Sequence, residues 1–193
     1  MTALLVIRHA PTDWNESGLI QGRTDRPLSE AGREELRRMR LPAGWEDALC
    51  LASPLRRAME TAELLGLAPI SEPRLVEMDW GAWEGRSLAE LRAAPGPEMA
   101  RNEARGLDFR PPGGESPREV QERLRPLLER LSVPTIAVTH KGVLRALYAM
   151  AAGWLMTEKP PQKLLNGHAH LFAVKPDGTP EVDRLNILLK APP

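Results

Sequence analysis

Basic and imidazole side chains follow three short apolar segments of the sequence, and together they have the chemistry of an anion-binding site. Arginine forms paired hydrogen bonds to phosphate, and a neutral imidazole can act as a nucleophile. Phosphate is therefore the ligand that this set of residue types favours. In chain order the side chains are Arg8, His9, Arg56, Arg57, His140 and Lys141.

The apolar segments before these side chains are predicted to be buried strands. Residues 3–7 and 49–52 are continuous apolar runs, and residues 135–139 are rich in β-branched side chains. Ligands of open α/β sheets bind outside the carboxyl ends of the strands, where helix N-termini add partly positive N–H groups. One Arg-His pair after a strand is usually a plain surface feature, whereas three converging strand ends favour an oxyanion site.

The alternation of strands and helices predicts an α/β fold, a three-layer α/β/α sandwich with a mainly parallel central sheet. Two late strands at 171–174 and 182–187 are expected to be joined by a turn at 176–178. Capping boxes begin two further helices, one at Ser87 and one at Ser116. Helices are expected at 29–41, 55–65, 116–131 and 142–153, with a short one after residue 87.

Residues 1–193 are expected to form one domain, because this length suits a single core. Residues 93–115 differ from the rest: they are rich in Pro, Gly and Arg and have room for at most one short helix. We interpret them as an insertion or lid, from which substrate specificity should come.

The composition excludes several classes of protein. The chain has 26 basic and 26 acidic residues, so it lacks the basic excess of a general nucleic-acid binder. Its one cysteine, Cys50, cannot form a disulfide framework and is predicted to be a buried core thiol. The apolar run 146–156 is too short to cross a bilayer, and the N-terminus does not have the pattern of a signal peptide. We expect a cytoplasmic protein with no membrane or nucleic-acid partner.

The motifs, taken in order, resemble those of the histidine phosphatase superfamily, whose members include phosphoglycerate mutases and small phosphatases. The similarity runs from Ala3 to about Ala151 and is nearest to the broad-specificity and α-ribazole phosphatases. The matching motifs are Arg8-His9-Ala10-Pro11-Thr12 with Trp14-Asn15, Gln21-Gly22, Asp25 and Pro27-Leu28-Ser29, then Ser53 to Ala58 with Thr61-Ala62, Leu75-Val76-Glu77 with Gly81 and Trp83-Glu84-Gly85, Pro112 to Ser116, and Val138-Thr139-His140 with Gly142.

The resemblance implies a role for each matching residue. His9 would be the nucleophile, with its second ring nitrogen donating to a backbone carbonyl, and Glu77 would be the proton donor. Arg8, Arg57 and a protonated His140 would hold the phosphoryl oxygens. The residues expected to complete the pocket are Asn15, Gln21 and Lys141, with Trp14 and Trp83 as walls; Arg56 is expected to be a solvated neighbour.

Two positions depart from the family pattern. Ala10 stands where the family usually has glycine, which would be strained if the position required a positive φ. Lys141 stands where the family often has glycine; its ammonium could add charge to the pocket or point to solvent, and we favour solvent. No metal or cofactor is expected, because the pocket's own cations would neutralise the phosphoryl charge. The alternative of a metal site at His168 and His170 has no further ligand spaced nearby.

The function predicted is hydrolysis of a phosphomonoester of a small metabolite through a phosphohistidine intermediate. A phosphoglycerate mutase is the first alternative, but only 28 residues separate Gly85 from Gly114 and the family's mutases have a longer insertion and a C-terminal tail. Arg101, Arg105 and Arg110 could contact a second acidic group or form a solvated helix face.

A non-catalytic phospho-ligand binder is the alternative of another class. The late strands could also pair between subunits in a homodimer.

Overall fold

The computed structural model describes residues 1–94, 96 and 98–189, and it contains a six-stranded sheet in the order β3-β2-β4-β1-β5-β6. β1, β2, β3 and β4 are parallel to one another, whereas β5 pairs antiparallel with both β1 and β6; the sheet is mainly parallel, as predicted. The strands are β1 (Thr2–Arg8), β2 (Leu49–Ala52), β3 (Ile70–Ser71), β4 (Thr135–Thr139), β5 (His168–Val174) and β6 (Pro180–Leu188).

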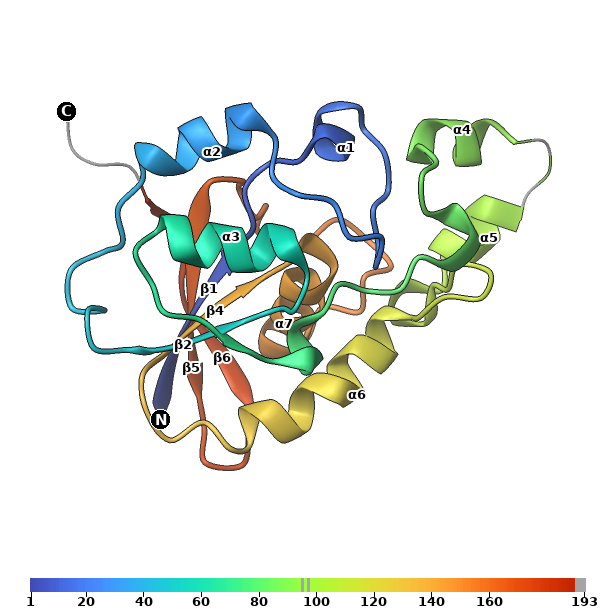
Figure 1. Ribbon diagram of the computed structural model, residues 1–193. Coiled ribbons are helices and arrows are strands. Elements are labelled where there is room, and N and C mark those ends of the chain that lie inside the picture. The colour runs from blue at the N-terminus through green and yellow to red at the C-terminus, as the bar shows by residue number, and fades with distance from the viewer. Residues whose placement is uncertain (95, 97, 190–193) are drawn as a thin grey trace.

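Helices cover both faces of this sheet, so the predicted three-layer architecture is confirmed (Figure 1). Side chains of β1 alternate between two buried clusters: Leu4 and Val6 face one, and Leu5 and Ile7 face the other. α6 and α7 supply the first cluster and α2 and α3 the second. The helices are α1 (Asp13–Glu16), α2 (Glu30–Arg37), α3 (Arg56–Leu64), α4 (Leu88–Ala93), α5 (Glu98–Glu103), α6 (Pro117–Leu128) and α7 (Lys141–Ala152).

Local sequence signals explain where several helices begin and end. Ser87 and Ser116 each accept from the backbone N–H three residues on, so both predicted capping boxes form. Gly153 ends α7 in the left-handed conformation, which costs glycine little. α2 ends at Arg37 rather than near residue 41, because the chain turns and the N–H of Arg40 donates to the carbonyl of Leu189.

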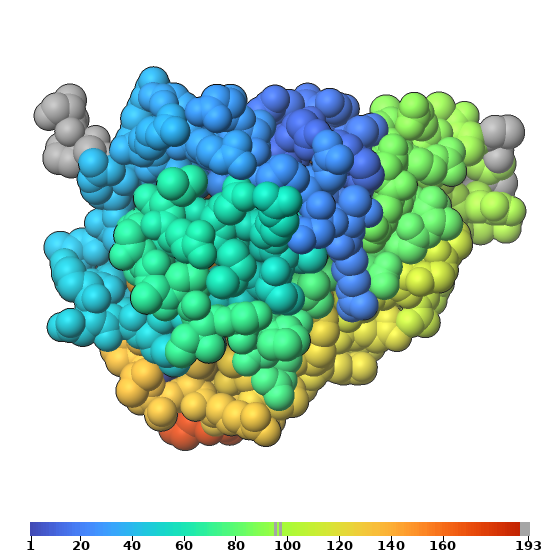
Figure 2. Space-filling view, in the orientation of Figure 1, coloured from blue at the N-terminus to red at the C-terminus, as the bar shows by residue number. Residues whose placement is uncertain are grey.

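The residues just before the segment predicted to be an insertion lie beside the loop that follows β1. Leu19 and Ser87 form an isolated antiparallel bridge, and the N–H of Ile20 donates to the carbonyl of Arg86. Figure 2 shows the segments around residues 15–25 and 85–94 side by side. Within 93–115 the structure describes α5 and a short 3-10 turn, Gly106–Asp108.

Two further sequence predictions can be compared with the structure here. Cys50 is buried in the core, as predicted. In the described part of the chain, no helix has the length and apolar character that a membrane crossing requires.

Candidate active site

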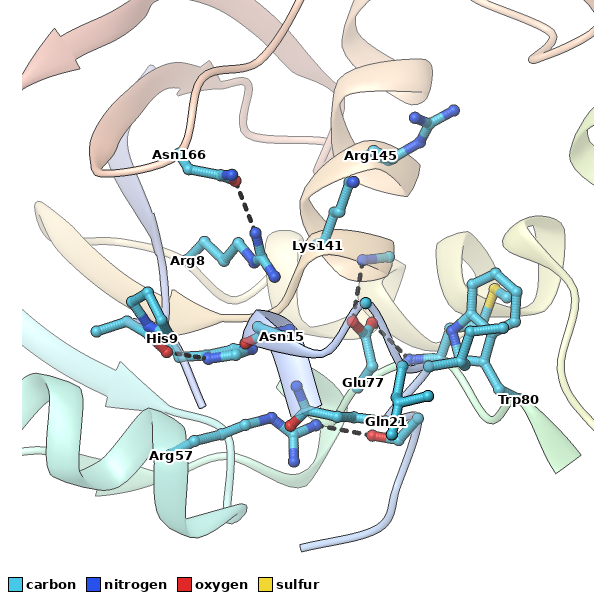
Figure 3. A pocket seen from close by; sticks show the side chains of 18 of the residues that line it. Arg8, His9, Asn15, Gln21, Arg57, Glu77, Trp80, Lys141, Arg145 and Asn166 are labelled. Carbon is cyan, nitrogen blue, oxygen red and sulfur yellow. Dashed lines mark hydrogen bonds between the residues drawn. The ribbon is translucent and has the colours of Figure 1, made fainter. Parts of the chain in front are cut away.

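The side chains singled out in the sequence gather at the carboxyl end of the parallel strands, around a cavity of about 710 Å³ (Figure 3). Arg8 and His9 come from the end of β1, Arg57 from the first turn of α3, and Lys141 from the start of α7. The other predicted residues in the wall are Asn15, Gln21 and Glu77. His140 is the exception, since it is fully buried and is not part of the cavity wall.

The ring of His9 is oriented by a single backbone contact. Its Nδ1 lies 2.7 Å from the carbonyl oxygen of Ala10, which can only accept, so Nδ1 carries the proton and Nε2 is free. Burial, followed by the charges of Arg8 and Arg57, holds the pKa of His9 well below its ordinary value. The imidazole is therefore neutral at pH 7 and has an unprotonated nitrogen, as predicted for a nucleophile.

Ala10 is accommodated without strain in this loop. Its φ is negative, because the non-glycine residues with positive φ in the described chain are Met156 and Asn186. The N–H of Ala10 donates to Thr61 Oγ1 at 3.0 Å, and that hydroxyl donates to the carbonyl of Arg57 at 2.6 Å. α3 thus fixes the loop that carries His9, and the absence of glycine does not distort it.

Arg57 is fully buried and is held by backbone carbonyls of the loop that follows α1. Its Nη2 donates to the carbonyl of Gly22 at 2.7 Å and its Nη1 to that of Thr24 at 2.9 Å. Its Nε donates to His140 at 3.2 Å, so N–H groups on Nη1 and Nη2 remain for a ligand in the cavity. Arg56, in contrast, is exposed and pairs with Glu60, as predicted for a solvated neighbour.

The structure differs from the sequence prediction at His140, which we expected to be protonated and directed at the phosphoryl group. Its Nδ1 accepts from Arg57, so its Nε2 donates to Ser53 Oγ at 2.7 Å. Burial, followed by the charges of His9 and Arg57, keeps the pKa of His140 well below its ordinary value. The ring centroids of His140 and His9 are 5.0 Å apart. His140 is therefore a neutral ring behind the cavity wall.

Glu84 organises the loop that holds Arg57, a role that the sequence reasoning missed. Its carboxylate accepts from the backbone N–H groups of Arg23 and Thr24 at 2.7 and 3.0 Å. A Cβ on Gly22 would lie 1.9 Å from Glu84 Oε1, so this approach requires glycine. The Trp83-Glu84-Gly85 motif indicated that Glu84 matters. It did not indicate the partners of Glu84, because Arg23 and Thr24 lie some sixty positions earlier in the chain.

Arg8 has donors that no protein group satisfies. Its Nη1 donates to Asn166 Oδ1 at 2.6 Å, whereas its buried Nε has no partner among the described residues. A buried donor without a partner is costly, and an oxyanion in the cavity would satisfy it. Gln21 is also buried, but its unpartnered atom in the described part of the chain is Oε1, an acceptor, which needs a donor rather than an oxyanion.

Glu77 is buried in the wall of the same cavity. Its Oε1 accepts from the N–H of Met78 at 2.8 Å and its Oε2 from that of Gly142 at 3.2 Å. Burial raises the pKa of Glu77, against the opposing effect of these two bonds and of the nearby Arg57 and Arg8. A carboxyl group with a raised pKa is suited to donating a proton.

Asn15 and Lys141 also lie in the wall of this cavity. The side-chain oxygen of Asn15 completes a capping box with Thr12, which leaves its amide group for the cavity. Lys141 is exposed, as the favoured solvent orientation predicted, and it also lines the cavity, where partial burial and the charge of Arg8 lower its pKa. The two orientations weighed for Lys141 therefore do not exclude each other: its side chain meets both solvent and the pocket.

Other predicted neighbours lie elsewhere. Trp80 lines the cavity, whereas Trp14 and Trp83 do not; Trp83 packs against Phe109, which is itself part of the wall. The wall also lacks the arginines weighed as contacts for a second acidic group, and one of these pairs with Glu119 at the surface. They are Arg101, Arg105 and Arg110. The cavity instead has Arg92 and Arg145 in its wall.

The His168 and His170 pair does not belong to a metal cluster. Both lie on β5, and His170 is fully buried with Nδ1 accepting from the N–H of Asn186 at 3.3 Å. Among the described residues, no three His, Cys, Asp or Glu side chains are placed to hold a metal ion.

The geometry combines a free imidazole nitrogen, two arginines with open donors and a carboxyl group with a raised pKa. Such an arrangement can bind a phosphoryl group, attack it in line and protonate the group that leaves.

The chain is similar to known proteins along most of its length. The family model for the histidine phosphatase superfamily (branch 1) matches residues 4–188. A glucosyl-3-phosphoglycerate phosphatase of Mycolicibacterium vanbaalenii is 35% identical over 169 residues, which is 78% of this chain and 74% of that protein. A 2,3-bisphosphoglycerate-dependent phosphoglycerate mutase of Methylobacterium sp. is 32% identical over 199 residues, covering 94% of this chain and 96% of that one.

A solved structure agrees with the fold. The crystal structure of the protein TTHB049 from Thermus thermophilus superposes with a TM-score of 0.77 at 32% sequence identity, covering 97% of this chain and 100% of that one.

Proposed function

The chain belongs to branch 1 of the histidine phosphatase superfamily, and from that premise we propose that it hydrolyses phosphomonoesters of small metabolites through a phosphohistidine intermediate. The observation that carries the proposal is the free Nε2 of a neutral His9 beside two arginines with open donors. The similarity to small phosphatases that act on phosphorylated metabolites supports the same conclusion.

In the first step, Nε2 of His9 attacks phosphorus and the bond to the leaving oxygen breaks. The lone pair of Nε2 becomes the N–P bond, and the electrons of the broken P–O bond go to the leaving oxygen. The carbonyl of Ala10 holds the proton on Nδ1 and stabilises the positive charge that the ring acquires.

Arg8 and Arg57 are proposed to neutralise the equatorial oxygens during transfer. Phosphoryl transfer depends more on positioning and charge stabilisation than on covalent chemistry. The unsatisfied Nε–H of Arg8 and the remaining N–H groups of Arg57 are the donors available for this. The side-chain amides of Asn15 and Gln21 would complete the shell, and His140 would act by positioning Arg57.

Glu77 is proposed to donate a proton to the leaving oxygen and then to accept one from water. Burial raises the pKa of Glu77 and so favours the protonated carboxyl group that a general acid requires. In the second step the water oxygen attacks phosphorus, the N–P bond breaks, and phosphate leaves. His9 and Glu77 are both restored to their starting states.

Release of phosphate from p-nitrophenyl phosphate tests this proposal. We expect turnover without bisphosphoglycerate and in the presence of a chelator, since no step uses a metal or a cofactor. His9→Ala should lose turnover but still bind inorganic phosphate. Hydrolysis that continues in this variant, or that stops when metals are chelated, would contradict the mechanism.

A phosphoglycerate mutase is the second candidate, favoured by the 94% of this chain that a mutase relative matches. A mutase must keep its phosphohistidine away from water. The short segment between Gly85 and Gly114 favours the hydrolase. An absolute requirement for bisphosphoglycerate would reverse this choice. The non-catalytic binder is the weaker case, because the proposed nucleophile, acid and arginines are all present.

Three other predictions stay untested: a cytoplasmic location, a homodimer, and a lid formed by residues 93–115. Leu88, Arg92, Glu103, Gly106 and Phe109 line the cavity, so the region around this segment is placed to contact a substrate.

A further inference from the structure

A smaller cavity of about 130 Å³ adjoins the main one on the side of α7. The two cavities have four lining residues in common, which are Arg8, Lys141, Arg145 and Asn166. The guanidinium of Arg8 therefore borders both, and a molecule whose phosphate lies against Arg8 could extend a second group into the smaller cavity. We call this smaller cavity the side pocket.

The side pocket has an unusual charge. Its wall includes four basic residues and no Asp or Glu, although the chain as a whole has equal numbers of both signs. Lys163 from the loop before β5 is the fourth basic residue, beside Arg8, Lys141 and Arg145. None of these four takes part in an ion pair with a carboxylate among the described residues.

These cations repel one another, and two of them, Arg8 and Arg145, are held in place by neighbouring side chains. Burial lowers the pKa of Lys141, and so do the charges of Arg8 and Arg145. The guanidinium of Arg145 stacks on the ring of Trp154, 5.0 Å from its centroid, so it has a fixed position. Lys141 and Arg145 are four residues apart on α7 and lie on one side of that helix (Figure 3). Arg8 and Arg145 are partly desolvated and have no ion-pair partner among the described residues, so an anion between them and Lys141 would be stabilising.

We propose that the side pocket binds a second anionic group of the substrate, so that the enzyme prefers phosphomonoesters that carry a carboxylate or another phosphate. This rests on the proposed phosphatase function and narrows its substrate class. Lys141 and Arg145 are the specificity-determining residues, with Lys163 at the rim. The phosphate to be hydrolysed lies against His9, Arg8 and Arg57, and the second anion lies beyond Arg8.

A matched set of substrates tests the inference. Glycerol 3-phosphate and 3-phosphoglycerate differ chiefly in a carboxylate, and glycerol 1,3-bisphosphate offers a second phosphate instead. We expect kcat/KM to be about tenfold higher or more for one of the two anionic substrates than for glycerol 3-phosphate, as one charge-assisted hydrogen bond supplies. The substrate with the higher kcat/KM identifies whether the side pocket binds a carboxylate or a phosphate. Equal values for all three would overturn the inference.

Variants locate the effect. Lys141→Gln and Arg145→Gln should each lower the ratio of kcat/KM for the preferred anionic substrate to that for glycerol 3-phosphate, chiefly through KM. Lys159→Gln is the matched control, since Lys159 is exposed and lies in the wall of neither cavity. An unchanged ratio in both variants, with their unfolding midpoints preserved, would contradict the side pocket. If no phosphomonoester is hydrolysed at all, the proposed function itself fails.

Discussion

Carboxyl groups next to arginine behave oppositely at the surface and in the cavity. Asp108 receives two hydrogen bonds from Arg118, at 2.6 and 2.9 Å, and this pairing lowers the pKa of Asp108. Glu77 lies near Arg8 and Arg57, yet burial raises its pKa. At the surface the two opposite charges pair with each other. In the cavity the arginines have no carboxylate paired with them among the described residues, and burial favours the protonated form of the carboxyl group.

The difference shows how one set of residue types can serve two purposes. Around Arg118 water and an ion-pair partner hold the charges, and solvent screens them. Around Glu77 backbone N–H groups hold the carboxyl group, which is mostly buried. Burial without a direct salt bridge thus gives an acid and two free cations in one small space.

Among the variants on either side of this comparison, Glu77→Gln should lose the most activity, because it removes the carboxyl proton that is proposed to reach the leaving oxygen. We expect kcat on an alkyl phosphate to fall by about 10²–10⁴. The loss should be smaller for p-nitrophenyl phosphate, whose leaving group needs little protonation. Steady-state kinetics with the two substrates check this, and equal losses on both would argue against Glu77 as the acid.

The pH dependence of activity is a second test of Glu77 as the proton donor. Activity on the alkyl phosphate should fall as pH rises through the raised pKa of Glu77, because the carboxyl group then loses the proton it must donate. It should fall at acid pH only well below 6.5, where the depressed pKa of His9 is reached. Glu77→Gln should abolish the alkaline limb alone.

Arg8→Gln should rank next, because it removes a cavity cation that forms no ion pair with any described carboxylate. We expect kcat/KM to fall by about 10²–10³ on all phosphomonoesters. Inorganic phosphate should raise the unfolding midpoint of the wild type much more than that of the variant. Thermal melts with and without phosphate measure this, and equal shifts would show that Arg8 does not bind the anion.

Gly142→Ala should have an intermediate effect, because a Cβ there would lie 2.5 Å from Glu77 Oε1. The carboxyl group would have to move away from the N–H that it accepts from. We expect a loss of about tenfold or more on an alkyl phosphate, as misplacement of a catalytic group can cost that much, and a smaller loss on p-nitrophenyl phosphate. A variant as active as the wild type on both would show that this placement of Glu77 is not required.

Arg118→Gln, on the surface side of the comparison, should have the smallest effect. Its partner is half-exposed and solvent screens the pair, so exposed ion pairs of this kind contribute little. We expect unchanged kinetics and an unfolding midpoint within experimental error. A large loss of activity in this variant would break the distinction between paired surface charges and unpaired cavity charges.

Much of the fold was predictable because its signals are local. The apolar runs predicted β1, β2 and β4, and the capping boxes predicted the starts of α4 and α6. The edge strand β3 was missed because its two residues, Ile70 and Ser71, are exposed and have no pattern. The four residues of α1 were missed because so short a helix has no periodicity.

The candidate site was predictable in its members but not in all of its contacts. Motif order predicted that Arg8, His9, Arg57 and Glu77 would meet, and they do. The neutral state of His140 could not be predicted, because it depends on Ser53, which is 87 positions away in the chain. Arg145 was missed although it stands four residues after Lys141, a helical spacing that places both on one side of α7.

The most direct test of the account is to trap the phosphorylated enzyme. A turnover with a ³²P-labelled phosphomonoester is quenched at alkaline pH, and the labelled peptide is then mapped. We predict a label on His9 that is stable in alkali, labile in acid, and absent from His9→Ala. A label on any other side chain, or none at a time when phosphate is being released, would contradict the account.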